Sequence, residues 1–422
     1  MRHLILMGLV ATSACDGSGA DSGTPSPTGL EVTDSAGVRV VTNPPGDLVY
    51  AELAEEPLLS IGQLTGPDEL LFGRIATARR DGAGNVIVAD RQAHQIRVFD
   101  AGGRHLQTLG REGEGPGEFE TLSGAWVVRY RDGTSGDSRQ IIAADSELDR
   151  ITLFSGEGAP MGTATLAGRE DMSIRPIGLA GPDAVLSRAS PFNLPDFGNL
   201  GGSITGLMGA LLGGEENSRV LFVLHRLDGA LADTLAGGRD PVIGTVAMGD
   251  GAFSFAIPFS PESGAAGSPH GVVVTGGTHY AISIFEDGSL RLIARLDESP
   301  PARTDEHLER YVRGSEGSDA DEAEVRERIE RYHQVPLRDS LPAYTDILFA
   351  EEGEVWARRY RFADAPVARW DVFAPDGVYL GRVAVPTSFR IEEVSRGQAL
   401  GVATDELGVE RVQIRELTLS GS

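Results

Sequence analysis

The sequence predicts an all-β protein folded as a six-bladed β-propeller, with four-stranded antiparallel blades and a short helical insert between blades four and five. Three observations support this prediction. Short apolar or alternating runs recur between turn residues along most of the chain, as strands do. A unit of three such runs repeats at spacings of roughly 40 to 60 residues. The last repeat lacks its third run, and a segment near the N-terminus matches the missing part.

The clearest unit is "GNVIVADRQAHQIRVFDAGGRHLQTLG" (residues 84–110), which reads as strand, loop, strand, Gly-Gly turn and strand. Degenerate copies occupy residues 139–166, 218–235, 271–296, 354–385 and 398–417. An apolar segment precedes each unit and supplies the expected inner strand, at residues 73–80, 124–130, 174–180, 253–259, 344–350 and 389–395. Six blades of four strands follow from this count.

The ring is expected to close through the N-terminus. "VTDSAGVRVV" (residues 32–41) matches the turn and final strand of "VFDAGGRHLQ", with Asp34 and Gly37 in the places of Asp100 and Gly103. We therefore expect residues 38–42 to be the outermost strand of the last blade, which removes the open sheet edge. Residues 29–422 then form a single propeller domain.

The segment "DGAGNVIVADRQAHQIRVFDAGGRHLQTLGREGEGPGEF" (residues 81–119) resembles the NHL repeat. From about residue 29 onward the chain is similar to six-bladed propeller lipoproteins of bacteria that carry NHL-like repeats. The resemblance implies a fold and export from the cytoplasm. It implies no reaction, because propellers serve as enzymes, binding proteins and scaffolds alike.

The N-terminal "MRHLILMGLVATSAC" (residues 1–15) has a basic start, an apolar run too short to span a bilayer, small residues and the only cysteine, Cys15. This pattern predicts a signal peptide, and "TSAC" resembles the end of a bacterial lipoprotein signal, in which the cysteine is lipidated. Ordinary cleavage that leaves a free cysteine is the alternative. Residues 16–28 are expected to be a flexible tether. We expect an exported protein, anchored on the periplasmic or cell-surface side of a bacterial envelope.

The charge balance limits the classes of binding partner that the protein is expected to have. The chain has 62 acidic residues, 37 basic residues and a formal net charge of −25, and every basic residue is arginine. This acidity disfavours nucleic acids and anionic membrane surfaces. We expect a monomer that contacts the membrane only through its lipid anchor and binds a protein, peptide or glycan.

The glycine-rich "GREGEGPGEFE" (residues 110–120) superficially resembles a phosphate-binding loop. Phosphate loops precede a helix and usually carry lysine. Here a β-branched and aromatic segment follows, and Glu112, Glu114 and Glu118 would repel an anion. The loop is best interpreted as a connector between blades.

The propeller pattern predicts that the loops between second and third strands share one end of the ring with the connections between blades. Two inserts, residues 191–217 and 300–342, fall at this end. The second should contain two short helices, with Thr304 as an N-cap and Val325, Ile329 and Tyr332 on one helix face. These helices either cover apolar surface at the rim or, with residues 207–212, form a lid.

Four polar residues in loops at this end are candidates for ligand contact: His94, Arg111, Arg150 and His279. The alternative for each is a solvated loop residue, or for Arg150 an ion pair with Asp145. Asp90 and Asp145 recur at equivalent places in their units, which favours a structural role as acceptors of backbone N–H bonds in a turn.

No catalytic or metal-binding motif is recognisable. The eight histidines are scattered, there is no second cysteine, and "GSDADEAE" (residues 317–324) reads as a helix start rather than a calcium loop. Propeller lactonases that use calcium place acids and amides at the inner strands. Here the inner strands offer Arg74, Arg175, Asp346 and Glu392.

The sequence therefore favours a non-enzymatic binding or scaffold module without a cofactor, acting through the insert-bearing end. The alternative is a hydrolase or lyase of the lactonase-like type that uses the axial channel, with calcium as its metal.

Overall fold

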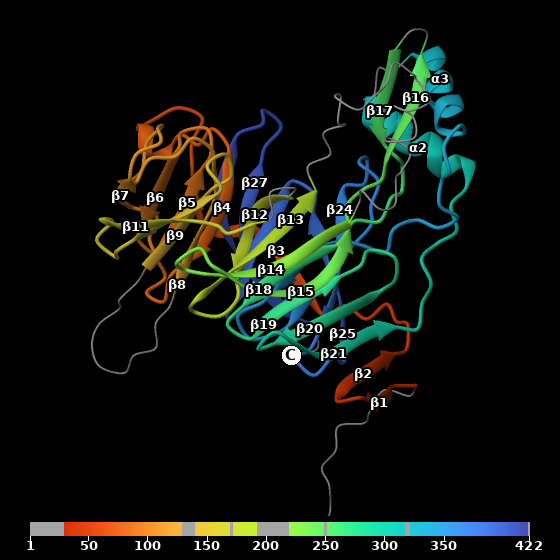
Figure 1. Cartoon of the computed structure of the whole chain (residues 1–422), viewed down its shortest axis with the longest axis horizontal. Helices are drawn as coiled ribbons and strands as arrows, with labels where there is room; N and C mark the ends of the chain where they lie inside the picture. Colours follow the sequence, from red (N-terminus) through yellow and green to blue (C-terminus); the bar gives the residue numbers. More distant parts are fainter. Residues whose placement is uncertain are drawn as a thin grey trace, which may run out of the picture.

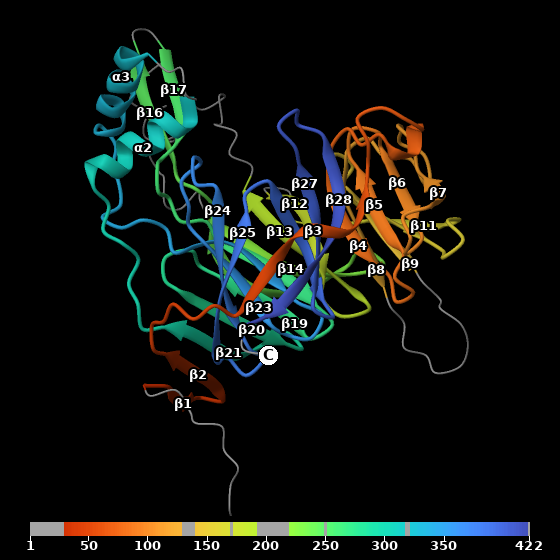
Figure 2. The same ribbon diagram turned by 180° about the vertical axis from the view of Figure 1, so that it is seen from behind.

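The computed structural model describes residues 29–128, 140–168, 172–191, 219–248, 251–316 and 321–420. Within these residues the strands form six sheets with four strands or more, and one separate two-stranded hairpin. Figures 1 and 2 show these elements from opposite sides. The six-bladed β-propeller with four-stranded antiparallel blades, predicted from the sequence, is confirmed.

Each of blades one to three consists of four strands that are consecutive in the chain. Blade one contains β4 (Ile75–Arg80), β5 (Val86–Asp90), β6 (Gln95–Phe99) and β7 (His105–Leu109), after the short 3-10 helix η1 (Asp68–Leu70). Blade two contains β8 (Leu122–Val128), β9 (Gln140–Asp145), β10 (Arg150–Phe154) and β11 (Pro160–Thr165). Blade three contains β12 (Met172–Leu179), β13 (Ala184–Pro191), β14 (Arg219–Arg226) and β15 (Leu231–Arg239).

Blades four and six include strands from the N-terminal segment, whereas blade five does not. Blade four contains β18 (Gly264–Ser268), β19 (Gly271–Thr275), β20 (Ala281–Glu286) and β21 (Ser289–Leu296), extended by β2 (Val38–Asn43) and β1 (Glu31–Ser35). Blade five contains β22 (Tyr344–Phe349), β23 (Val355–Arg359), β24 (Val367–Phe373) and β25 (Tyr379–Pro386). Blade six contains β26 (Phe389–Ser395), β27 (Gln398–Thr404), β28 (Glu410–Leu419) and β3 (Ala51–Ile61).

The first strand of every blade is its inner strand. These strands contact one another in the order β4, β8, β12, β18, β22 and β26, and β26 contacts β4 again. The closed cycle of contacts defines the axis of the propeller.

The period-two alternation of strand residues explains how the blades adhere. Every residue of β5, "VIVAD", is buried. Val86 and Val88 pack in a cluster shared with blade six, whereas Ile87 and Ala89 pack in a cluster shared with blade two. Successive side chains point to opposite sheet faces, so each strand contributes to two seams. Each of the six seams between neighbouring blades contains one such apolar cluster.

The ring closes through the N-terminal part of the chain, but the predicted closing strand is wrong. Residues 38–43 form β2, which pairs in parallel with β21 of blade four, with Val41 opposite Ala294. Blade six is closed instead by β3, which pairs antiparallel with β28 in the register that places Ile61 opposite Val412. The match that suggested residues 38–42 reflects a shared turn, because the Asp34 carboxylate accepts a bond from the backbone N–H of Gly37.

The inner strand of blade four also differs from the prediction. Residues 251–256 form β17 (Gly251–Ala256), which pairs with β16 (Ile243–Met248) in a hairpin outside the ring. The inner strand is β18, whose sequence "GAAGS" is poor in large apolar residues. Gly267 explains this composition, because a Cβ there would overlap the carbonyl oxygen of Leu179 in the neighbouring blade.

The helical insert lies between β21 and β22, as predicted for the connection between blades four and five. It contains α2 (Asp305–Glu316) and α3 (Glu322–Tyr332). The hydroxyl of Thr304 accepts a bond from the backbone N–H of His307, which confirms the predicted N-cap. Figures 1 and 2 show the two helices beside the hairpin β16–β17, at one edge of the ring.

A small apolar core holds this subdomain together. Leu308 and Val312 of α2 and Val325 of α3 are buried against Phe259, which follows the hairpin. The rings of Phe255 and Tyr332 meet edge to face, with centroids 5.1 Å apart. The apolar faces of both helices are therefore used within the subdomain, as the rim-covering interpretation requires. Residues 192–218, which include the rest of the proposed lid, lie outside the described residues.

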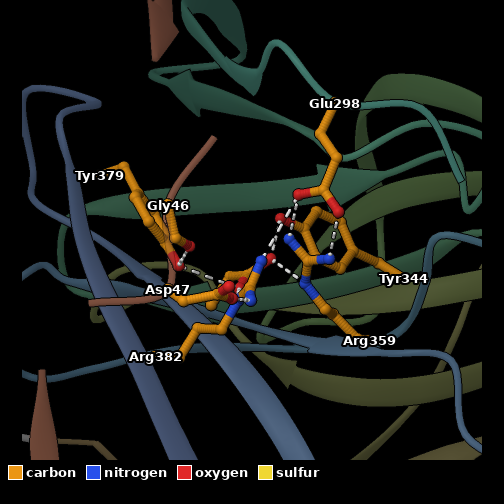
Figure 3. Close-up of polar contacts among 8 residues, drawn as sticks. Gly46, Asp47, Glu298, Tyr344, Arg359, Tyr379 and Arg382 are labelled. Atoms are coloured by element: carbon orange, nitrogen blue, oxygen red, sulfur yellow. Dashed lines mark hydrogen bonds and ion pairs between the residues drawn. The ribbon is translucent and has the colours of Figure 1, made fainter. Parts of the chain in front are cut away.

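A buried polar network joins blades four and five, and Figure 3 shows its members around Arg359 and Arg382. The carboxylate of Asp371, which is fully buried, accepts bonds from Arg359 Nε at 2.7 Å, Arg382 Nε at 3.0 Å and the Tyr344 hydroxyl at 2.8 Å. Glu298, which follows β21 of blade four, accepts from both terminal nitrogens of Arg359, at 2.8 and 2.7 Å. Burial and the neighbouring Asp371 raise the pKa of Tyr344 well above its ordinary value, so this phenol stays a donor.

Candidate functional site in the axial cavity

An axial cavity of about 1170 Å³ passes between the inner strands. Residues of all six inner strands line it. A space of this size is comparable to the pockets that hold small molecules or the ends of larger ligands. Its wall brings together polar side chains of different blades.

One part of the wall is an ion-paired lattice from blades six and one. Glu392 of β26 is paired with Arg79 of β4 at 2.8 Å and also with Arg390. Glu393 accepts from Arg80 Nε at 2.9 Å, and Arg80 also donates to the hydroxyl of Ser395. These carboxylates are already neutralised by arginine, so this part of the wall serves to join the last blade to the first.

Asp346 is a further carboxylate of the wall. Its side chain is 48 % exposed, and this surface faces the cavity; its partner is Arg358, at 3.4 Å. Partial removal of the carboxylate from water raises the pKa of Asp346. The positive charge of Arg358 opposes this effect, whereas the negative charge of Glu392 adds to it. A carboxyl with a raised pKa in a cavity is suited to donate or accept a proton.

Two of the chain's three tryptophans belong to the wall, Trp126 of β8 and Trp370 of β24. The indole ring of Trp126 lies over Gly124, because a Cβ at residue 124 would clash with the six-membered part of the ring. The indole nitrogen of Trp126 is buried and has no hydrogen-bond partner among the described residues. The wall thus combines aromatic surface with charge.

The four candidates predicted from the sequence lie elsewhere, and none of them lines this cavity. Arg111 belongs to the glycine-rich connector of residues 110–120, and His94 and Arg150 bond to it. His94 Nδ1 lies 3.0 Å from the carbonyl oxygen of Phe119, and Arg111 is paired with Glu118. Arg150 donates to the carbonyl oxygens of Glu114, at 2.6 Å, and Glu118, at 2.8 Å.

Three of the candidates therefore hold one loop in place. The alternative partner predicted for Arg150, Asp145, is not the one observed. The fourth candidate, His279, is exposed and bonds to the neighbouring hydroxyl of Thr278 at 2.9 Å. The geometry does not bring His279 together with the other three.

Asp90 and Asp145 have the structural role predicted for them. The Asp90 carboxylate accepts bonds from the backbone N–H groups of Gly73, Arg74, Gln92 and Ala93. Asp145 accepts from those of Glu120, Thr121, Glu147 and Leu148 in the next blade. Each carboxylate fixes a second-to-third strand turn against the start of the inner strand.

The described residues contain no group of three or more His, Cys, Asp or Glu side chains placed to hold a metal ion. Neither α2 nor α3 is long and apolar enough to cross a membrane, nor is any other helix in the described ranges.

The comparison with family models agrees with the observed fold. Residues 61–165, from the end of β3 to the end of β11, match a family model described as a 6-bladed β-propeller. No curated protein matches the sequence. Similar solved structures include a candidate exported protein of Bacteroides fragilis, 11 % identical, covering 89 % of this chain and 99 % of its own, with a TM-score of 0.47.

Two propeller enzymes are also similar in structure. The virginiamycin B lyase of Staphylococcus aureus is 10 % identical, covers 82 % of this chain and 95 % of its own, and has a TM-score of 0.37. A gluconolactonase of Xanthomonas campestris is 12 % identical, with coverages of 87 % and 99 % and a TM-score of 0.37. With six sheets in a closed ring and the family match over blades one and two, the chain is a six-bladed β-propeller.

Proposed function

We propose that this protein is an exported, lipid-anchored binding module, and that its protein, peptide or glycan ligand enters the axial cavity from the insert-bearing end. The axial cavity of about 1170 Å³, with charged and aromatic side chains in its wall, is the observation that carries the proposal. Export and attachment through Cys15 rest on the pattern of residues 1–15, which lie outside the described residues.

The loops support the choice of end. The connection from β15 to β18 carries the hairpin β16–β17, and the connection from β21 to β22 carries α2 and α3. Both emerge where the inner strands begin. Loops carried on a rigid scaffold are where binding residues concentrate. Elaboration at one end of the ring is therefore expected of a binding face.

Tryptophan fluorescence tests the proposal. Peptide and glycan panels would first be screened for binding, and each ligand found would then be titrated while tryptophan emission is followed. Because Trp126 and Trp370 line the cavity, an occupant should change the emission. The change should disappear in the Trp126→Phe, Trp370→Phe double variant and persist in Trp356→Phe, since Trp356 does not line the cavity. A ligand that binds without changing the emission would contradict entry into the cavity.

Asp346 favours a second candidate function, a hydrolase or lyase that uses the axial cavity. With its raised pKa, this carboxyl could accept a proton from water or substrate and return it to a leaving group. Hydrolysis of lactones, measured with and without Ca²⁺, tests this candidate. We expect turnover that is lost in Asp346→Asn. If Ca²⁺ binds only the native protein, it should also raise the Tm. The candidate fails if no lactone is hydrolysed in either condition.

A further inference from the structure

Two arginines are fixed side by side where blade one begins. Arg74 directly precedes β4 and Arg91 directly follows β5. The backbone N–H of Arg91 donates to the carbonyl oxygen of Arg74 at 2.8 Å, and the Asp90 carboxylate holds the backbone N–H of Arg74 at 3.1 Å. Both positions are therefore set by one turn, which the buried Asp90 carboxylate holds at the insert-bearing end of the ring.

A third arginine reaches this region from blade three. Arg175, on β12, is exposed and lines the axial cavity. Arg91 reaches towards the axis as well, because its Nε donates to the carbonyl oxygen of Leu122, the first residue of the inner strand β8, at 3.3 Å. Arg175 of blade three thus lines the cavity itself, and Arg74 and Arg91 of blade one lie beside it, where the charges of Arg74 and Arg175 act on Arg91.

The charges of these three arginines are not compensated by the described part of the protein. Four other arginines of the cavity wall, Arg79, Arg80, Arg188 and Arg390, each have a carboxylate partner. Arg74, Arg91 and Arg175 have none among the described residues. Burial, followed by the positive charges of Arg175 and Arg74, lowers the pKa of Arg91. In a chain with 62 acidic and 37 basic residues, three neighbouring guanidinium ions without a carboxylate partner leave a local positive charge that attracts an anion.

We propose that Arg74, Arg91 and Arg175 form an anion subsite at the insert-bearing mouth of the axial cavity, which binds a carboxylate, phosphate or sulfate group of the ligand. This inference rests on the proposed function and adds to it the charge of the ligand. Guanidinium groups present fixed forks of N–H donors that match the oxygens of such anions. The Asp90 turn fixes two of the three backbone positions before any ligand arrives, so less ordering is required on binding.

The subsite also explains how an acidic protein can take an acidic ligand. The net charge of −25 repels anions at long range, but this repulsion is screened beyond about 8 Å at physiological ionic strength. At contact, the three local positive charges and their hydrogen bonds decide the interaction. Affinity should therefore depend on these arginines individually and not on the overall charge.

Calorimetric titration of the full folded chain with sulfate, phosphate and glucuronate, at one fixed chloride concentration, tests the proposal. We expect at least one of the three anions to bind, and its identity distinguishes the sources of the anionic group. Arg175→Gln should weaken that binding about tenfold or more, because a charge-assisted hydrogen bond is lost. Arg74→Gln is the second variant. Arg369→Gln is the matched control, since Arg369 is an exposed arginine of β24.

The Tm without anion separates a binding role from a structural one. Arg175 forms no ion pair among the described residues, so Arg175→Gln should leave the Tm unchanged or raise it by relieving repulsion. The proposal is overturned if the wild type binds none of the three anions, or if Arg175→Gln and Arg369→Gln behave alike. A neutral ligand that changes tryptophan emission equally in wild type and Arg175→Gln would overturn this inference and leave the proposed function intact.

Discussion

Asp371 shows how a single buried carboxylate can organise a seam between two blades. Asp371 lies in β24 and receives bonds from side chains of β22, β23 and β25, so all three of the other strands of blade five contribute to its environment. Arg359 extends the network to Glu298 and lies over the ring of Tyr280, 4.0 Å from its centroid. The two arginines and the carboxylates around them neutralise one another inside the protein.

Replacing Asp371 should therefore be costly. In Asp371→Asn the charges of Arg359 and Arg382 lose their shared buried partner, and we expect a loss of about 3–5 kcal/mol in the free energy of unfolding. Chemical denaturation measures the change. Asp376→Asn, at an exposed turn of the same blade, is the control and should change stability by less than about 1 kcal/mol. Equal losses in the two variants would show that the network contributes nothing.

Asp346 should affect stability in the opposite direction. Because its pKa is raised in the folded protein, the charged form destabilises the fold, and the cost appears as the pH rises from the ordinary aspartate range through the raised pKa. Asp346→Asn should raise the Tm at pH 7 and leave it unchanged near about pH 3, where the carboxyl is protonated in both states. Thermal melts across this range test the sign, with the exposed Asp183→Asn as control. A lower Tm at pH 7 would contradict it.

At this scale the sequence predicts local roles better than shared ones. Asp90 and Asp145 could be recognised as turn residues because their bonds are to backbone groups close by along the chain or in the preceding connector. The candidates His94, Arg111 and Arg150 were identified as loop residues, but their partners are carbonyl and carboxylate groups of one connector. Arg91 was missed, because its significance depends on the charge of Arg175 in blade three.

At the scale of elements, the N-terminal strands β2 and β3 have separate tasks. β2 lengthens blade four at its outer edge, whereas β3 completes blade six. Asn43, at the end of β2, is 1 % exposed; it donates to the carbonyl oxygen of Gly377 at 2.9 Å and accepts from the backbone N–H of Tyr379 at 2.8 Å. β2 therefore contributes to the seam between blades four and five without being part of the ring closure.

Two truncations distinguish these tasks. A chain that begins at residue 45 lacks β1 and β2 but keeps β3, so it should fold cooperatively with a lower Tm. A chain that begins at residue 63 also lacks β3 and leaves the edge of β28 unpaired, so it should lose cooperative unfolding or aggregate. Calorimetry and size-exclusion chromatography measure the outcome. If the shorter chain were as stable as the longer, β3 would not be the closing strand.

The repeat pattern predicts the existence and order of the strands, but not every pairing. Residues 32–41 were correctly predicted to contain a turn followed by a strand, since Asp34 and Gly37 define that turn. The partner of that strand could not be predicted, because an outer edge strand makes few sequence-specific contacts. The inner strand β18 was missed for a related reason: close packing requires small residues, and these give a weak apolar signal.

At the scale of the whole molecule, the acidic charge should limit stability at low ionic strength. A net charge of −25 on one ring produces repulsion that salt screens. We expect the Tm to rise as NaCl is increased from about 10 mM to about 150 mM, over which the screening length falls from about 30 Å to about 8 Å. Scanning calorimetry tests this, with sucrose as a control for effects other than screening. A Tm that falls with salt would indicate that ion pairs dominate over the net charge.

The course of the N-terminal segment along the outside of the ring has a mechanical consequence. β2 runs beside β21; Leu48 and Tyr50 then bond to the backbone of Arg382 in β25, and β3 follows beside β28. One stretch of chain is thus hydrogen-bonded to three neighbouring blades. A pulling force applied to the start of this stretch would act first on the pairing with blade four and then on the bonds to blade five. The ring would stay closed until the pairing of β3 with β28 broke.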